Sequence, residues 1–286
     1  MRVVVCIKQV PDQTLIKFNI ETGRLNNIHY LMDPVDEASV SEAIRIRERN
    51  GGEVIAISLG PPRTEDVLRT CLKMGVDEAI HLRDDIFDNL DIYSISIVLA
   101  KQIARLKYDI ILCGRESMDE GNGFLGAGIA EWLDLPLVTS VTRLDVFADT
   151  MTARVHRRIK GGDREILEAP LPAVFAVESV LAKPVYPPLR TILTGLKKQI
   201  IKVDAKSVGV DKNSLQPMLA TLSVSQPKPR LKKTATIDSK LSAHERMKLL
   251  MSGGTQQKSS KTIEKPPQAA VADIIQFLIS HGIIST

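Results

Sequence analysis

The sequence predicts an α/β fold in which helices flank an open, mostly parallel sheet. Short runs of β-branched residues alternate along the chain with stretches whose apolar residues recur at helical spacing. This alternation is typical of parallel strands joined by crossover helices. The chain has 286 residues, 44% of them hydrophobic, which is enough to bury one substantial core. We therefore expect a Rossmann-like sheet, followed by a long C-terminal arm that ends in a helix.

The alternation is clearest in the first half of the chain. Strands are expected over residues 3–7, 54–59, 78–82 and 109–113. Helices are expected over residues 36–49, 63–74 and 95–106, and from about residue 122 to just before Pro136. Gly75 is the expected C-cap of the helix over residues 63–74. Each of these helices has an apolar face with which to cover the sheet.

The pattern changes after about residue 138, where strands follow one another without long helices between them. They are expected over residues 141–147, 152–158, 165–167 and 173–177, as an extension of the parallel sheet at its edge. Gly161 and Gly162 indicate a hairpin turn within this block. Pro187 and Pro188 then interrupt the pattern before a short helix near residues 191–198.

The last third of the chain has the composition of an arm. From about residue 202 to residue 267 the sequence is polar and contains linker signals, with one small helix expected over residues 241–251. The segment over residues 266–283 has apolar residues at helical spacing, and this face predicts docking on the chain's own core or on another subunit. We therefore divide the chain into a domain over residues 1–200 and an extended arm over residues 201–286.

Composition and charge exclude several classes of protein. The net charge is only +4, and basic residues are interleaved with acidic ones, so the sequence does not predict a nucleic-acid partner. The N-terminus does not resemble a secretory signal, and no apolar run approaches the roughly 18 residues that span a bilayer. These features predict a cytoplasmic protein without direct membrane insertion. Cys6, Cys71 and Cys113 have no disulfide or metal-site spacing and are expected as buried thiols.

A ligand is expected beyond the carboxyl ends of the parallel strands, where loops converge. Loops at residues 6–12, 33–36, 59–61 and 114–125 meet this condition. The last loop leads from a strand into a helix and contains Gly121 and Gly123, which favours a phosphate near the helix N-terminus. A plain structural turn explains this loop equally well, and Asp36 fits a simple helix cap as well as a ligand contact.

The sequence contains no recognisable catalytic constellation. The loop after the first strand lacks the Ser-Gly-Gly sequence of ATP-dependent ligases, and no Walker loop, HExxH or GxSxG motif is present. The five histidines are dispersed, so no base or metal cluster is predicted. We therefore expect a site that holds a nucleotide without catalytic residues or a metal.

Several motifs together resemble the beta, or small, subunits of electron transfer flavoproteins. They occur in the family's order over roughly the first 200 residues. They are Cys6-Ile7-Lys8-Gln9-Val10-Pro11-Asp12, Asp33-Pro34-Val35-Asp36-Glu37-Ala38, Ser58-Leu59-Gly60-Pro61, Met74-Gly75-Val76-Asp77-Glu78-Ala79, Cys113-Gly114-Arg115 and the hairpin from Val155-His156-Arg157 through Pro172-Ala173-Val174. The sequence departs from the family at Phe124, where glutamine is usual, and at Lys160 and Phe175 in the hairpin.

The resemblance implies an adenine nucleotide alpha-hydrolase-like fold and a set of cofactor contacts. The implied contacts are Cys6, Asp33, Pro34, Val35, Asp36, Leu59, Gly114, Arg115, Glu116, Ser117, Met118, Asp119, Glu120, Gly121, Asn122, Gly123, Phe124 and Leu125. It also implies a partner-recognition loop near residues 178–198, with Leu181 as an exposed apolar anchor. An ordinary core leucine is the alternative reading of Leu181.

By the same resemblance, the chain carries electrons and is not necessarily an enzyme in its own right. Its partners are an alpha subunit and an acyl-CoA or other dehydrogenase. The beta subunit holds either FAD or AMP, with FAD in the alpha subunit. The motif ending in Asp36 is more similar to the FAD-holding branch, in which the flavin takes a hydride from NADH and bifurcates the electrons, sometimes with iron–sulfur subunits. A stand-alone adenine-nucleotide sensor that forms a homodimer is the competing class.

Overall fold

The computed structural model describes residues 1–15, 17–19, 24–26, 28–212, 214–215, 217–219, 222, 242–251, 265–280 and 284. The chain divides into two compact units, Met1–Leu222 and Ser223–Thr286. The first unit therefore extends beyond the domain boundary expected at residue 200. It does so because Ile200–Val203 forms a strand of the main sheet, and because Ala205 and Val208 behind it are buried.

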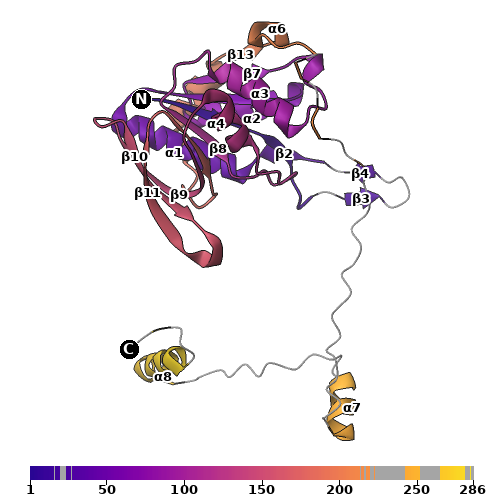
Figure 1. Cartoon of the computed structure of the whole chain (residues 1–286), viewed down its shortest axis with the longest axis vertical. Coiled ribbons are helices and arrows are strands. Elements are labelled where there is room, and N and C mark those ends of the chain that lie inside the picture. The colour runs from indigo at the N-terminus through magenta and orange to yellow at the C-terminus, as the bar shows by residue number, and fades with distance from the viewer. Residues whose placement is uncertain are drawn as a thin grey trace. The chain divides into compact units, whose positions relative to one another are not determined.

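The first unit is built on a nine-stranded sheet of mostly parallel strands (Figure 1), in the order β11-β10-β9-β12-β8-β1-β6-β7-β13. The strands are β1 (Arg2–Cys6), β6 (Glu53–Leu59), β7 (Glu78–Leu82), β8 (Ile110–Gly114), β9 (Leu137–Phe147), β10 (Thr152–Arg158), β11 (Arg164–Pro170), β12 (Ala173–Val177) and β13 (Ile200–Val203). In the part of the sheet ordered β9-β12-β8-β1-β6-β7-β13, all neighbouring strands pair in parallel. The α/β class predicted from the sequence is confirmed.

Helices cover both faces of this sheet. They are α1 (Pro34–Asn50), α2 (Glu65–Met74), α3 (Ile92–Ile103), α4 (Leu125–Leu133), α5 (Leu189–Lys197) and α6 (Ala205–Val208). Alternate residues of β1 point to opposite faces, so Val3 and Val5 join the core under α1 and α2, while Val4 packs with α3, α4 and α6. Gly75 ends α2 in the left-handed conformation, as the sequence predicts.

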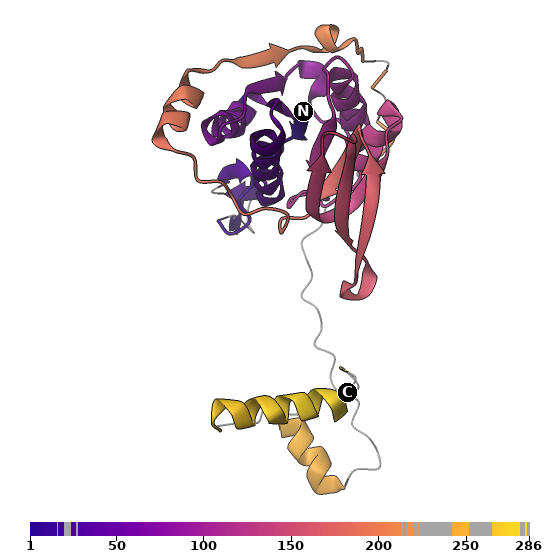
Figure 2. The same cartoon turned by 90° about the vertical axis from the view of Figure 1, so that its left-hand side faces the viewer.

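The predicted hairpin is present, but it does not extend the sheet in parallel. β10 pairs antiparallel with both β9 and β11, and only β9 and β12 continue the parallel arrangement. Gly161 and Gly162 both have positive φ in the turn that joins β10 to β11, where a side chain would be strained. The two strands project from the edge of the sheet (Figures 1 and 2).

Smaller elements complete the described chain. Two short antiparallel ladders join β2 (Gln9–Pro11) to β5 (Tyr30–Met32) and β3 (Lys17–Asn19) to β4 (Arg24–Asn26). The second unit contains α7 (Ala243–Met251) and α8 (Pro267–Ser280), which confirms both helices expected in the arm. Within the described residues, no helix has the length and apolar character needed to cross a membrane.

Candidate functional site

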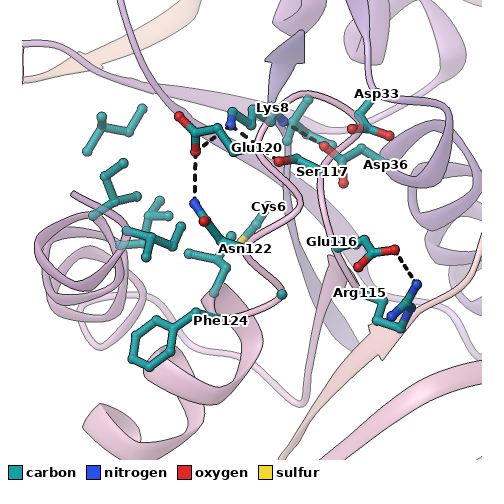
Figure 3. Close-up of a pocket in the computed structure, with 18 residues that line it drawn as sticks. Cys6, Lys8, Asp33, Asp36, Arg115, Glu116, Ser117, Glu120, Asn122 and Phe124 are labelled. Atoms are coloured by element: carbon teal, nitrogen blue, oxygen red, sulfur yellow. Dashed lines mark hydrogen bonds and ion pairs between the residues drawn. The ribbon is translucent and has the colours of Figure 1, made fainter. Parts of the chain in front are cut away.

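The order in which the chain adds strands reverses at β1, and this reversal creates a crevice at the edge of the sheet. The chain adds β6 and β7 on one side of β1, then returns through α3 to place β8 on the other side. In open α/β sheets, such a switch point is where ligands bind, beyond the carboxyl ends of the strands. A pocket lies there (Figure 3), lined by Cys6, Ile7, Lys8, Asp33, Asp36, Leu59, Ile92, Ile95, Leu99, Gly114, Arg115, Glu116, Ser117, Glu120, Asn122, Gly123, Phe124 and Leu125.

Most of the residues expected at the site meet in this pocket, and four of the five exceptions lie together next to it. Pro34, Val35, Met118 and Gly121 line a neighbouring groove on the other side of the loop after β8, together with residues 177–179. Asp119 lines neither cavity, but its carboxylate pairs with a pocket side chain. The loop expected to bind a phosphate therefore separates two hollows at the same edge of the sheet.

The sequence interpretation missed one wall of the pocket, and it included Lys8 only as part of the ligand loop over residues 6–12. Ile92, Ile95 and Leu99 come from α3 and give the pocket an apolar side. Helical spacing places Ile95 and Leu99 on the apolar face of the helix expected over residues 95–106, and this spacing by itself predicts packing on the sheet. Lys8 follows β1 at the edge where the other loops converge, and that position was the available signal for including it.

Lys8 connects the loop after β1 to the loop after β8. Its Nζ lies 2.8 Å from Asp119 Oδ1. It also lies 3.1 Å from Glu120 Oε2 and 3.4 Å from Ser117 Oγ (Figure 3). Burial opposes ionisation of Asp119, but hydrogen bonds from Lys8 and Ser117 bring the pKa of Asp119 below its usual value. The ammonium group of Lys8 therefore pairs with two carboxyl groups of the same loop.

Two carboxyl groups at the start of α1 bind backbone N–H groups. Asp33 is the N-cap, since its Oδ1 accepts from Val35 N at 3.1 Å, and Asp36 does not simply cap the helix. Asp36 Oδ2 instead accepts from Lys8 N at 2.7 Å, and the same carboxyl group accepts from the backbone of Gly114. Burial, together with the nearby charge of Asp33, raises the pKa of Asp36 to about 8.

The cysteines are free and buried, as the sequence predicts. Burial raises the pKa of the Cys6 thiol well above its usual value, and it raises that of Cys113 to about 12. A thiol is a poor nucleophile unless it ionises. Cys6 therefore contributes a small, uncharged surface to the pocket.

The start of α4 presents donors at the edge of the pocket. Phe124 occupies the N-cap position, and its side chain makes no capping hydrogen bond. The first N–H groups of a helix have no partner within the helix, so an uncapped N-terminus favours an anion. Gly121 and Gly123 adopt positive φ just before it, where any other residue would be strained. The helix start after these two glycines therefore has no side-chain cap at the edge of the pocket.

Leu181 does not have the exposure expected of a partner anchor. It is half-buried and packs against the core under α1 and α2. Elsewhere in residues 178–198, the exposed apolar side chains include Leu189 (70%), Leu193 (52%) and Leu196 (50%). These three leucines recur at helical spacing on α5, while Gly195 on the same helix is buried against α2. The exposed apolar surface of this region therefore includes a face of α5, as well as Val180 (63%) and Tyr186 (99%) before it.

Fold and site together define an open parallel α/β protein with a loop-lined crevice at the switch point of its sheet. Residues 26–208 match the model of the electron transfer flavoprotein domain. The chain is 37% identical to an electron transfer flavoprotein subunit beta of Thermoanaerobacterium thermosaccharolyticum, covering 75% of this chain and 83% of that protein. It is 33% identical to the caffeyl-CoA reductase-Etf complex subunit CarD of Acetobacterium woodii (73% and 80%) and 30% identical to Protein FixA of Azotobacter vinelandii (84% and 89%). The chain belongs to the beta-subunit family of electron transfer flavoproteins.

Proposed function

We propose that this chain is the beta subunit of a heterodimeric electron transfer flavoprotein and that it holds FAD in the crevice at the end of β1 and β8. The observation that carries the proposal is the convergence of Cys6, Asp36, Leu59 and the loop over residues 114–125 on one pocket. The motif that includes Asp36, similar to the FAD-holding branch of the family, favours FAD over AMP.

The residues of the pocket fit an adenine nucleotide. Ile92, Ile95 and Leu99 offer an apolar wall for a planar ring. The uncapped N-terminus of α4 offers backbone N–H groups to a phosphate. AMP and FAD share this adenosine phosphate portion, so both are compatible with the same wall and the same donors.

The chain itself contributes binding and orientation. A bound flavin supplies the redox chemistry, which includes acceptance of a hydride from NADH in the bifurcating version of the proposal. The apolar wall excludes water, the start of α4 fixes the phosphate, and the buried thiols stay protonated because their pKa values are raised. No side chain of the pocket is assigned a role as catalytic acid or base.

The proposed partners are an alpha subunit and an acyl-CoA or other dehydrogenase in the cytoplasm. The name of the Acetobacterium relative, which records a complex with a caffeyl-CoA reductase, supports a partner that acts on a CoA substrate. We assign the dehydrogenase contact to the α5 face formed by Leu189, Leu193 and Leu196, in place of Leu181. Iron–sulfur subunits belong to the proposal only if electrons are bifurcated.

Purification of the native complex tests the proposal. We expect this chain to copurify with a larger flavin-bearing subunit, and acid extraction to release two FAD per heterodimer. AMP with one flavin per heterodimer would refute the bifurcating version and leave an AMP-holding electron carrier. A homodimer without flavin would refute the electron-transfer role and favour the stand-alone sensor.

A further inference from the structure

The loops of the pocket are joined to one another through the first turn of α1. Lys8 ends the segment after β1, Gly114 ends β8, and Met118 lies in the loop between β8 and α4. The backbone N–H of each of these residues donates to a carboxyl group of Asp33 or Asp36. Two side chains three residues apart therefore connect the segments that follow β1 and β8 at the switch point.

Asp33 makes two separate connections with its two oxygens. Oδ1 caps α1 by accepting from Val35 N at 3.1 Å, while Oδ2 accepts from Met118 N at 2.7 Å. The side chain is only 1% exposed, and its own backbone N donates to Lys8 O at 3.2 Å. Both oxygens are thus occupied by protein donors, which leaves Asp33 poorly placed as a direct ligand contact.

Asp36 is enclosed in the same way. It is 6% exposed, and it accepts from Lys8 N and from the backbone of Gly114. A Cβ atom at position 114 would lie 3.1 Å from Asp36 Oδ1 and 3.1 Å from Val35 Cγ1. Glycine at this position therefore allows the carboxyl group to approach the end of β8 closely.

We propose that Asp33 and Asp36 are positioning residues, which hold the loops after β1 and β8 in the conformation that binds the nucleotide. This inference rests on the proposed function and changes the expected role of both residues from ligand contact to support. Loops that are ordered before binding lose less conformational entropy when the ligand arrives. Loss of the hydrogen bonds that Asp33 or Asp36 accepts from these loops should therefore weaken nucleotide binding, because the loops would be less ordered.

The Asp33→Asn substitution separates positioning from helix capping. Asparagine is also a good N-cap, and its single carbonyl oxygen can still accept from Val35 N. Its amide nitrogen then faces Met118 N, so the connection to the loop is lost. Asp84→Asn is a matched control, because Asp84 Oδ1 accepts from Ile86 N at 3.2 Å and its Oδ2 from Ala205 N at 3.1 Å, away from the pocket lining.

The experiment measures AMP binding to the full-length chain by calorimetry, together with amide hydrogen exchange at Met118. AMP is the portion common to both candidate nucleotides. For Asp33→Asn we expect faster exchange at Met118 without ligand, and AMP affinity at least tenfold lower than for the wild type, since a charge-assisted hydrogen bond is lost. Asp84→Asn should bind AMP as the wild type does.

Each other outcome contradicts the proposal in a distinct way. Unchanged AMP affinity in Asp33→Asn would refute positioning, and weaker binding with unchanged Met118 exchange would identify Asp33 as a direct contact instead. A wild-type chain that binds neither AMP nor FAD would refute the proposed function. The exchange measurement needs no ligand, so it would still show whether Asp33 orders the loop.

Discussion

Replacement of Asp36 with asparagine should change how the stability of this protein depends on pH. The folded pKa of Asp36 is raised from 3.8 to about 8, so folding favours the protonated carboxyl group. Its contribution to stability is fully present below the unfolded pKa and is lost as pH rises through the folded pKa. An amide at this position does not titrate, and the variant should therefore lack this dependence.

The size of the effect follows from the two pKa values. Between about pH 4 and the folded pKa of about 8, the folded state binds roughly one more proton at this site than the unfolded state. One proton corresponds to about 1.4 kcal/mol per pH unit, so Asp36 should lower the unfolding free energy by about 3 kcal/mol between pH 5 and pH 7. This is a large share of the roughly 5–15 kcal/mol that stabilises a typical domain.

Urea denaturation of the wild type and of Asp36→Asn between pH 5 and pH 8 would measure this difference. Other groups that face Asp36, namely Asp33, Lys8, Cys6, Cys71 and Cys113, are common to both proteins. A suitable control is Asp211→Asn, because hydrogen bonds from Ser214 lower the pKa of Asp211 and place its titration below this range. Parallel curves for the wild type and Asp36→Asn would refute the assignment of a raised pKa to Asp36.

Four other substitutions test the partner surface, the packing of the fold and the nucleotide site. Leu189→Ala should slow electron transfer to a dehydrogenase, measured by stopped-flow kinetics, without changing the bound nucleotide. Leu181→Ala should mainly lower the melting temperature, since Leu181 packs on the core. Slower transfer in Leu181→Ala with unchanged transfer in Leu189→Ala would contradict the α5 assignment. In Gly195→Ala a Cβ atom would lie 2.2 Å from the Leu72 carbonyl oxygen of α2, so we expect a loss of about 1–3 kcal/mol in urea denaturation. Trp132, the only tryptophan, lies on α4, and Trp132→Phe should remove any fluorescence change on AMP binding.

The sequence predicts most of the central sheet because each of those strands has a compact β-branched run between recognisable helices. β13 was missed because Ile200 and Val203 are only half-buried and Lys202 is exposed, so the segment resembles the polar arm that follows it. This edge strand is specified by its backbone pairing with β7. Pairing of this kind leaves little hydrophobic pattern in the sequence.

The site was predicted where loops follow strands, and it was missed where a helix borders a cavity. Helical spacing identifies the apolar face that contains Ile95 and Leu99, but it does not distinguish a position that faces the sheet from one that faces the pocket. The predicted exposure of Leu181 does not match the structure for a related reason. Only the packed structure determines which leucine of a loop enters the core.

The two carboxyl groups at the start of α1 act on the site through the protein backbone. An electron carrier needs its cofactor held in one orientation, while the redox chemistry comes from the cofactor itself. Under the positioning proposal, Asp33 and Asp36 meet this need by fixing loop backbones, while the ammonium group of Lys8 pairs with the carboxyl groups of Asp119 and Glu120. A nucleotide placed between these loops would therefore meet ordered backbone donors. On this view, the acidic residues nearest the pocket stabilise its shape, and the direct contacts fall to the backbone of the loop before α4 and to the apolar wall of α3.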